Sequence, residues 1–159
     1  MTQINISHAI TVEVDVSRAW SFLWDIEALA RCIRGCTRVA TVESQRNYEA
    51  TVERSIGPFA LQVDLRMSVV SVDPPRLVEL EITGKDRRLK TRIYQTLSLS
   101  LRAEGQDRAH IAIEGVGTVT GVLASVGKVL IRSHIDEIVD EFAEGLRREI
   151  KASRRCSVS

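Results

Sequence analysis

The most constraining feature of the sequence is a strict alternation of apolar and polar residues between positions 59 and 69. The apolar residues at every second position are Phe59, Leu61, Val63, Leu65, Met67 and Val69. A period of two places successive side chains on opposite faces of a strand, so this segment predicts a strand with one buried face. Gly-Pro at 57–58 and Asp-Pro-Pro at 73–75 are turn formers that bound it.

Weaker versions of the same alternation lie on both sides of this strand. They predict further strands at 4–14, near 39–42, at 48–56, at 78–82, at 93–101 and at 109–116. Turn-forming residues separate most of these segments, and short connections favour antiparallel pairing. We therefore expect an antiparallel sheet of about six or seven strands.

Helical periodicity frames the run of strands. Two short helices are predicted after the first strand, at 18–24 and 26–33, where apolar residues recur three and four apart. A stretch without proline, from about 120 to 152, predicts one long helix. Its first part, 121–131, is apolar on nearly every side, whereas the part from 135 to 150 carries an ordinary amphipathic stripe.

Strands grouped together, with helices at both ends, predict an α+β fold in which a curved antiparallel sheet wraps around the long C-terminal helix. We expect residues 1–152 to form a single domain and residues 153–159 to form a flexible polar tail. A sheet curved around one helix leaves space between them, and that shape suits an apolar small molecule.

Charge and composition exclude several classes of function. The chain has 22 basic and 21 acidic residues and a net charge of +1, so it lacks the basic excess of a nucleic-acid-binding protein. It has no apolar run long enough to span a membrane. It begins without the basic and apolar segments of a secretory signal, so we expect a cytoplasmic protein.

Cysteine and histidine give no metal motif. The three cysteines, Cys32, Cys36 and Cys156, are an odd number, which indicates reduced thiols. The three histidines stand alone, without the spacing of a metal site. We also find no catalytic motif, and we expect no catalytic residue, no bound metal and no cofactor.

Four polar residues are candidate anchors for a ligand. His8, Arg54 and Gln95 share the parity of the buried strand faces, and His134 lies at the margin of the apolar stripe on the long helix. A buried guanidinium needs a carboxylate, a wet cavity or a ligand. The alternative is structural: Arg54 could extend to solvent from a strand end, and each histidine could have a local partner.

Inward-facing apolar residues are candidates for the wall of a cavity, or equally for ordinary core. The residues that we expect to line it are Ile33, Phe59, Val63, Leu65, Met67, Ile82, Leu97, Leu99, Leu123, Val126, Leu130 and Ile138. Because segment 121–131 is apolar all round, we expect it to face the cavity or a partner that covers the cavity mouth.

Two segments carry a resemblance to a known family. Residues 16–25 (VSRAWSFLWD) and 29–36 (LARCIRGC) resemble the N-terminal signature of the CoxG family of carbon monoxide dehydrogenase proteins. Residues 119–127 (VTGVLASVG) resemble the start of the last helix of that family, which lies within the START-like (SRPBCC) helix-grip superfamily. Two features depart from the pattern: Arg34 replaces a proline, and the chain ends at Ser159 without the apolar anchoring tail of some members.

The resemblance implies an accessory protein of a molybdenum-containing carbon monoxide dehydrogenase or a related hydroxylase. Its expected role is to bind or carry an apolar small molecule that is quinone-like or lipid-like. Two alternatives remain open at this stage. One is a cyclase or dehydratase that uses His8, Arg54 or His134, and the other is an assembly factor without a ligand.

Overall fold

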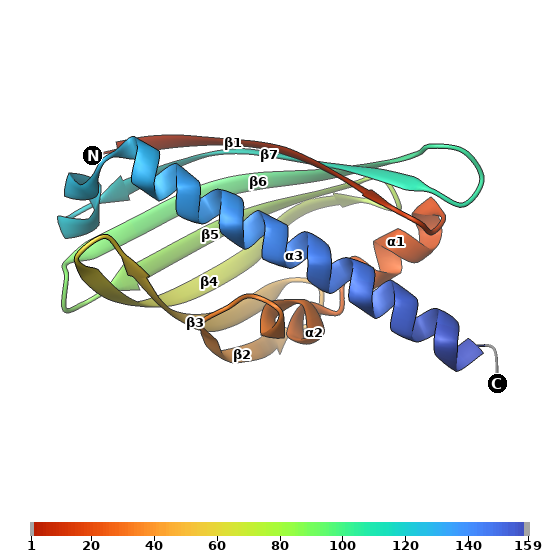
Figure 1. Ribbon diagram of the computed structural model, residues 1–159, viewed down its shortest axis with the longest axis horizontal. Coiled ribbons are helices and arrows are strands. Elements are labelled where there is room, and N and C mark those ends of the chain that lie inside the picture. Colours follow the sequence, from red (N-terminus) through yellow and green to blue (C-terminus); the bar gives the residue numbers. More distant parts are fainter. Residues whose placement is uncertain (1, 158–159) are drawn as a thin grey trace.

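The computed structural model describes residues 2–157, and its elements follow the predicted order (Figure 1). The seven strands are β1 (Thr2–Val12), β2 (Cys36–Glu43), β3 (Asn47–Ile56), β4 (Phe59–Asp73), β5 (Leu77–Asp86), β6 (Thr91–Ala103) and β7 (Ala109–Thr120). They form one sheet in the order β1-β7-β6-β5-β4-β3-β2, and every neighbouring pair is antiparallel.

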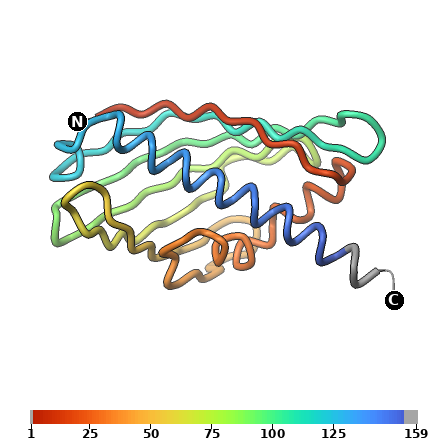
Figure 2. Tube along the Cα trace, viewed as in Figure 1, coloured from red at the N-terminus to blue at the C-terminus, as the bar shows by residue number. Residues whose placement is uncertain are grey.

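The helices all belong to one side of this sheet. They are α1 (Val16–Leu23), α2 (Ile26–Arg31), the short 3-10 helix η1 (Val122–Val126) and α3 (Lys128–Ser157). Helix α3 runs across the face of the curved sheet, while α1 and α2 lie beside its C-terminal half (Figures 1 and 2). The predicted α+β helix-grip architecture is therefore confirmed.

Aspartate side chains fix the starts of the two short helices. The carboxylate of Asp15 accepts a hydrogen bond from the backbone N–H of Arg18 at 2.9 Å, and Asp25 does the same for Ala28 at 3.4 Å. Such caps satisfy N–H groups that have no partner inside the helix. Helix α1 consequently begins two residues earlier than its apolar spacing predicts.

The predicted long helix does not begin at residue 120, because two glycines interrupt the segment. Gly121 has φ 90° and Gly127 has φ 93°, a backbone conformation that favours glycine. Strand β7 thus extends to Thr120, η1 fills the interval between the glycines, and α3 starts only at Lys128. At its other end α3 continues to Ser157, so the predicted tail is helical as far as it is described, and residues 158–159 lie outside the described part.

The interior is tightly packed at both ends of the molecule. At one end, Ile4, Val119, Leu123 and Ile131 are almost fully buried. At the other end, the equally buried side chains are Val12, Ala19, Leu101, Ala109, Ile111, Leu146 and Ile150. Between these two packed ends, several side chains that face the helix are only partly buried.

Candidate functional site

An apolar cavity of about 290 Å³ lies between the curved sheet and the helices, in the middle of the molecule. The side chains that line it come from α1, α2, every strand except β1, and the central part of α3. They are Trp20, Leu23, Trp24, Ile26, Ala30, Ile33, Cys36, Val39, Tyr48, Glu49, Ala50, Val52, Leu65, Met67, Val78, Leu80, Ile82, Leu97, Leu99, Ile113, Ile138, Val139 and Phe142.

Incomplete burial of the inward-facing strand residues is a direct sign of this empty space. Leu65 and Met67 on β4, Leu80 and Ile82 on β5, and Leu97 on β6 point toward the helices but are only partly buried. In a close-packed core, residues of this size at such positions lose nearly all contact with solvent. Their remaining accessible surface therefore borders the cavity.

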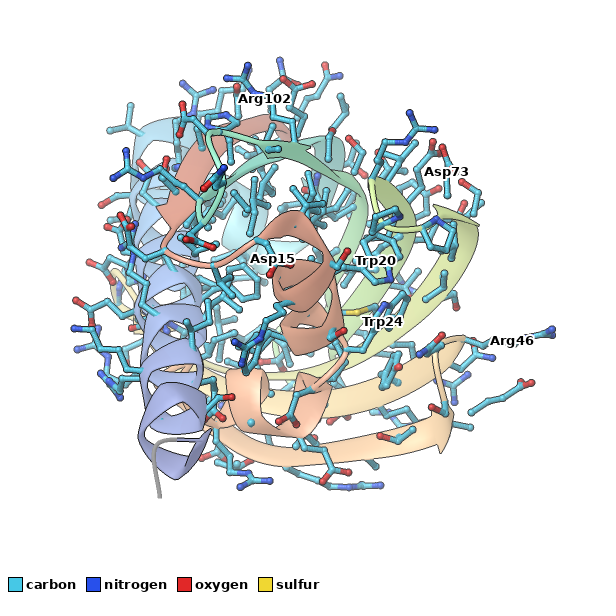
Figure 3. All side chains as sticks on the ribbon, turned by 90° about the vertical axis from the view of Figure 1, so that its right-hand side faces the viewer. Asp15, Trp20, Trp24, Arg46, Asp73 and Arg102 are labelled. Carbon is cyan, nitrogen blue, oxygen red and sulfur yellow. The ribbon has the colours of Figure 1, made fainter. Side chains whose placement is uncertain are left out.

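Aromatic side chains form the wall on the α1 side. The indoles of Trp20 and Trp24 meet edge to face, with ring centroids 5.8 Å apart and planes 75° apart, and both extend from α1 toward the sheet (Figure 3). Phe142 of α3 adds a third ring. Tyr48 lines the cavity too, but its hydroxyl accepts a hydrogen bond from the backbone N–H of Gln45 at 2.7 Å. The cavity thus combines a large apolar surface with very few polar groups, as sites for apolar ligands do.

Part of the predicted cavity wall is where the sequence places it. The predicted residues that border the cavity are Ile33, Leu65, Met67, Ile82, Leu97, Leu99 and Ile138. Contact of these residues with a ligand stays a prediction. The sequence analysis did not include the two tryptophans, because their helical spacing is equally typical of core, nor did it include Val139 and Phe142.

The other predicted wall residues, Phe59, Val63, Leu123, Val126 and Leu130, lie away from the cavity, at the end of the molecule where η1 is found. The backbone N–H of Leu123 donates to the hydroxyl oxygen of Thr91 at 3.2 Å, which ties η1 across the ends of the strands. Val126 and Leu130 pack toward Gly57 in the β3–β4 turn. Segment 121–131 closes this end of the fold, and α3 meets the cavity one to two turns later.

Arg54 is the most completely buried of the four predicted polar anchors. Its side chain is 8% exposed and forms ion pairs with Glu141 at 2.9 Å and Glu137 at 3.2 Å, both on α3. It also donates to the backbone carbonyl of Arg34 at 2.8 Å. The carboxylates that a buried guanidinium requires thus come from the long helix, and Arg54 joins β3 to α3 beside the cavity and not on its lining.

The remaining anchors also have positions outside the lining. His8 Nε2 lies 2.9 Å from Asp136 Oδ1 on α3, and Gln95 donates from its amide to the carbonyl of Thr96 at 2.8 Å. His134 Nδ1 is buried, has no hydrogen-bond partner among the described residues, and lies 3.7 Å from Glu137 Oε2. The side chains on which the cyclase alternative depends therefore do not meet in the cavity.

Thiols and possible metal ligands are also dispersed. Cys32 and Cys36 are free, and only Cys36 borders the cavity. The side chain of Cys156 lies outside the described part. Within residues 2–157, no three histidine, cysteine or acidic side chains gather as they would around a metal ion. The helices of this same region include none that is long and apolar enough to cross a bilayer.

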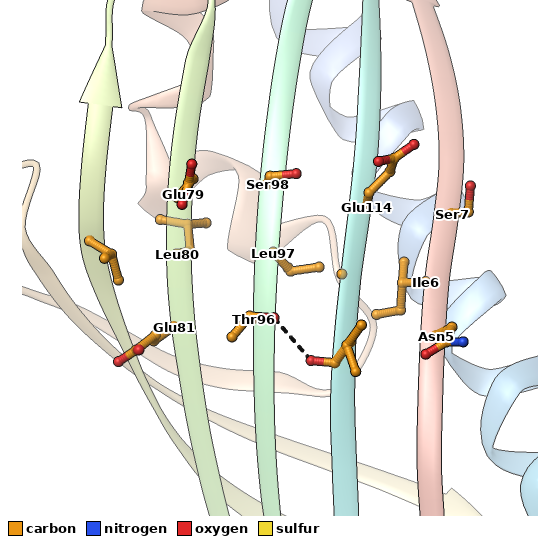
Figure 4. Close-up of a pocket in the computed structure, with 13 residues that line it drawn as sticks. Asn5, Ile6, Ser7, Glu79, Leu80, Glu81, Thr96, Leu97, Ser98 and Glu114 are labelled. Carbon is orange, nitrogen blue, oxygen red and sulfur yellow. Dashed lines mark hydrogen bonds between the residues drawn. The ribbon is translucent and has the colours of Figure 1, made fainter.

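The outer face of the sheet carries two shallower depressions. One, of about 500 Å³, lies across β1, β7, β6, β5 and β4 and is bordered by the exposed carboxylates of Glu79, Glu81 and Glu114 (Figure 4). The other, of about 670 Å³, is bordered mainly by charged residues such as Arg38 and Lys85. Both are wide and open to water, so the smaller inner cavity is the better candidate for a binding site.

Solved structures share this architecture. A conserved protein from Geobacillus kaustophilus is 20% identical and superposes with a TM-score of 0.85, over 94% of this chain and 97% of that one. A START superfamily protein from Mycobacterium smegmatis is 12% identical, with a TM-score of 0.69 over 93% and 97% of the two chains. An aromatase/cyclase from a Streptomyces strain is 11% identical, with a TM-score of 0.63 over 99% and 97%. At such identities the likeness shows the START-like fold alone.

Sequence comparison identifies the family. None of the curated proteins matches the chain in sequence. A family model for CoxG, a carbon monoxide dehydrogenase subunit, matches residues 9–151, which include both segments that carry the resemblance. The chain therefore belongs to the CoxG family of carbon monoxide dehydrogenase proteins.

Proposed function

We propose that this protein binds and carries one apolar small molecule, of the quinone or lipid class, in the cavity between the sheet and α3. The observation that carries the proposal is the apolar cavity of about 290 Å³, whose inward-facing walls stay partly unburied. Burial of apolar ligand surface contributes roughly 25 cal/mol per Å², so the hydrophobic effect alone supplies affinity without polar anchors.

The size of the cavity limits the ligand. Its volume lies near the lower end of the range of about 300–1,000 Å³ that ligand cavities span. A ring system or a short chain fits this space, and a longer chain has to extend beyond it. The tryptophan and phenylalanine rings of the wall favour a flat aromatic ligand such as a quinone head, because aromatic rings stack at offset or edge-to-face geometry.

Family membership supports the rest of the proposal. We infer that the protein acts in the cytoplasm beside a molybdenum-containing carbon monoxide dehydrogenase or a related hydroxylase, as an accessory that holds an apolar molecule for that enzyme. The similar fold of an aromatase/cyclase does not change this inference, since the histidines and Arg54 lie outside the cavity.

Native mass spectrometry of the purified protein tests the proposal. The expected result is a mass increment from one co-purified molecule that organic solvent extracts. Ala50 borders the cavity, so Ala50→Phe should fill it and abolish the increment. Ala60 is exposed on β4, so Ala60→Phe is the matched control and should keep the increment. A wild-type protein that binds neither a co-purified nor an added naphthoquinone or fatty acid would contradict the proposal.

A further inference from the structure

One end of the molecule brings together four segments that are distant in sequence. They are the β3–β4 turn, the β5–β6 turn, η1 and the first turn of α3, which meet at the end where β1 begins (Figures 1 and 2). Contacts between them are specific: the N–H of Val122 donates to the carbonyl of Leu89 at 3.4 Å, and Arg88 donates to the carbonyl of Ala60 at 2.7 Å. We name this end the basic end.

Five exposed cations define the basic end: Arg87, Arg88, Lys90, Lys128 and Arg132. Within residues 2–157, none of them forms an ion pair within 4.0 Å. The whole chain has a net charge of only +1, so these cations are a marked local excess.

The acidic residue in the same turn does not neutralise them. Asp86 is 3% exposed, and its carboxylate accepts backbone hydrogen bonds from Gln62 at 2.8 Å, Arg88 at 3.0 Å and Leu89 at 3.2 Å. Its charge is thus directed into the turn, while the cations extend outward.

Helix stability does not account for the cations on α3. Lys128 is the first residue of the helix and Arg132 lies one turn later, at the positive end of the helix dipole. Cations are unfavourable there by electrostatics alone. Their placement requires another explanation, such as an anionic surface outside the molecule.

Exposed valines lie among these cations. Val129 is 86% exposed in the first turn of α3, between Lys128 and Arg132, and Val122 of η1 is 37% exposed. Aliphatic side chains surrounded by lysine and arginine are typical of surfaces that rest in the headgroup region of an anionic bilayer. Two valines are too small an apolar area for the core of a stable protein interface.

We propose that the basic end docks the protein on the surface of a membrane that contains anionic lipids. Val129 and Val122 enter the headgroup region, and the five cations bind lipid phosphates around them. Helix α3 then points away from the bilayer, with the apolar cavity further from the membrane.

Flotation with vesicles tests this proposal. Vesicles of phosphatidylcholine mixed with phosphatidylglycerol should bind the wild-type protein, and binding should weaken with added salt. Vesicles of phosphatidylcholine alone should bind it much less. Because each cation contributes near an anionic surface, the double variant Lys128→Glu/Arg132→Glu should lose roughly tenfold or more of the partition coefficient. Val129→Glu should also reduce binding.

Matched controls separate docking from other effects. Lys151 is an exposed cation near the far end of α3 and Val70 is an exposed valine on β4, so Lys151→Glu and Val70→Glu should bind as the wild type does. Glutamate near the start of α3 favours the helix, so a loss of binding by the double variant does not arise from unfolding. The cavity variant Ala50→Phe should still bind vesicles, which separates this proposal from the proposed ligand.

Two results would overturn the proposal. One is a wild-type protein that fails to bind anionic vesicles, or that loses binding equally in the Lys151→Glu control. The other is a wild-type protein that ignores vesicles but binds polyglutamate through Lys128 and Arg132. In that second case the basic end serves an acidic protein.

Discussion

At the scale of single residues, the sequence places polar side chains on the correct face of the sheet but does not reveal their partners. Arg54 has the parity of the buried face, and it does point inward. Its partners, Glu137 and Glu141, lie more than eighty residues away on α3. Charge on the solvated face of a predicted helix gives no indication of which acid will meet which base, so the pairing could not be predicted.

Removing Arg54 should destabilise the fold more than removing an exposed arginine. Arg54→Met leaves two carboxylates on α3 without their buried partner, and we expect it to lower the free energy of unfolding by about 2–4 kcal/mol. Arg66 is the control, because it is well exposed and lies 3.7 Å from Glu49. Arg66→Met should cost less than about 1 kcal/mol. Urea unfolding of both variants measures the difference, and equal costs would show that the Arg54 cluster is not a buried ion-pair network.

Asp86 predicts a defined dependence of stability on pH. Burial alone would raise the pKa of Asp86, but hydrogen bonds from the backbone N–H groups of Gln62, Leu89 and Arg88 together lower it below its ordinary value of 3.8. A lowered pKa in the folded state means that the unfolded chain takes up the proton first as the pH falls. The stabilisation by Asp86 is therefore complete above about pH 4 and is lost as the pH falls through the folded pKa.

The variant Asp86→Asn tests this assignment. At neutral pH it should lower the free energy of unfolding by about 1.5–3 kcal/mol, because hydrogen bonds to a charged group are lost. The difference from wild type should shrink near pH 3, when the wild-type carboxyl becomes protonated. Unfolding in urea at both pH values gives the comparison, and the exposed Asp107→Asn serves as control. A gap that is the same at both pH values would mean that charge on Asp86 does not matter.

At the scale of elements, alternation and helical spacing are sufficient to predict the sheet and the helices but not the break before α3. Periodicity registers apolar side chains, and segment 121–131 is apolar throughout. The conformation of Gly121 and Gly127 decides the outcome, because a positive φ ends any helix that reaches it. The cavity wall shifted for the same reason: a helix that begins at Lys128 places Ile138, Val139 and Phe142 over the hollow part of the sheet.

Alanine substitution of the two glycines should show their separate roles. A Cβ on Gly127 meets nothing within 4 Å, so Gly127→Ala should cost only backbone strain, about 1–3 kcal/mol of unfolding free energy. A Cβ on Gly121 would collide with the carbonyl oxygen of Lys90, so Gly121→Ala should cost clearly more. Thermal and urea unfolding measure both variants. A Gly127→Ala cost equal to or greater than that of Gly121→Ala would contradict this account of the break.

At the scale of the whole molecule, two packed ends hold a hollow middle. The packed ends carry the stability of the fold, so the middle can remain empty or accept a ligand without loss of the architecture. The sequence predicts that an enclosed space exists, because a sheet of this length has to curve around one helix. It does not predict where that space lies, because core and cavity wall use the same apolar residues at the same spacing.

The most direct test of the proposed function uses the two tryptophans of the chain, Trp20 and Trp24, since both border the cavity. Titration with a soluble naphthoquinone should quench their fluorescence in a saturable way, with one ligand per chain. Ala50→Phe should abolish the saturable quenching, whereas Ala60→Phe should leave it unchanged. Quenching that rises linearly without saturation, or that is the same in both variants, would show that the cavity does not bind the ligand and would contradict the proposed function.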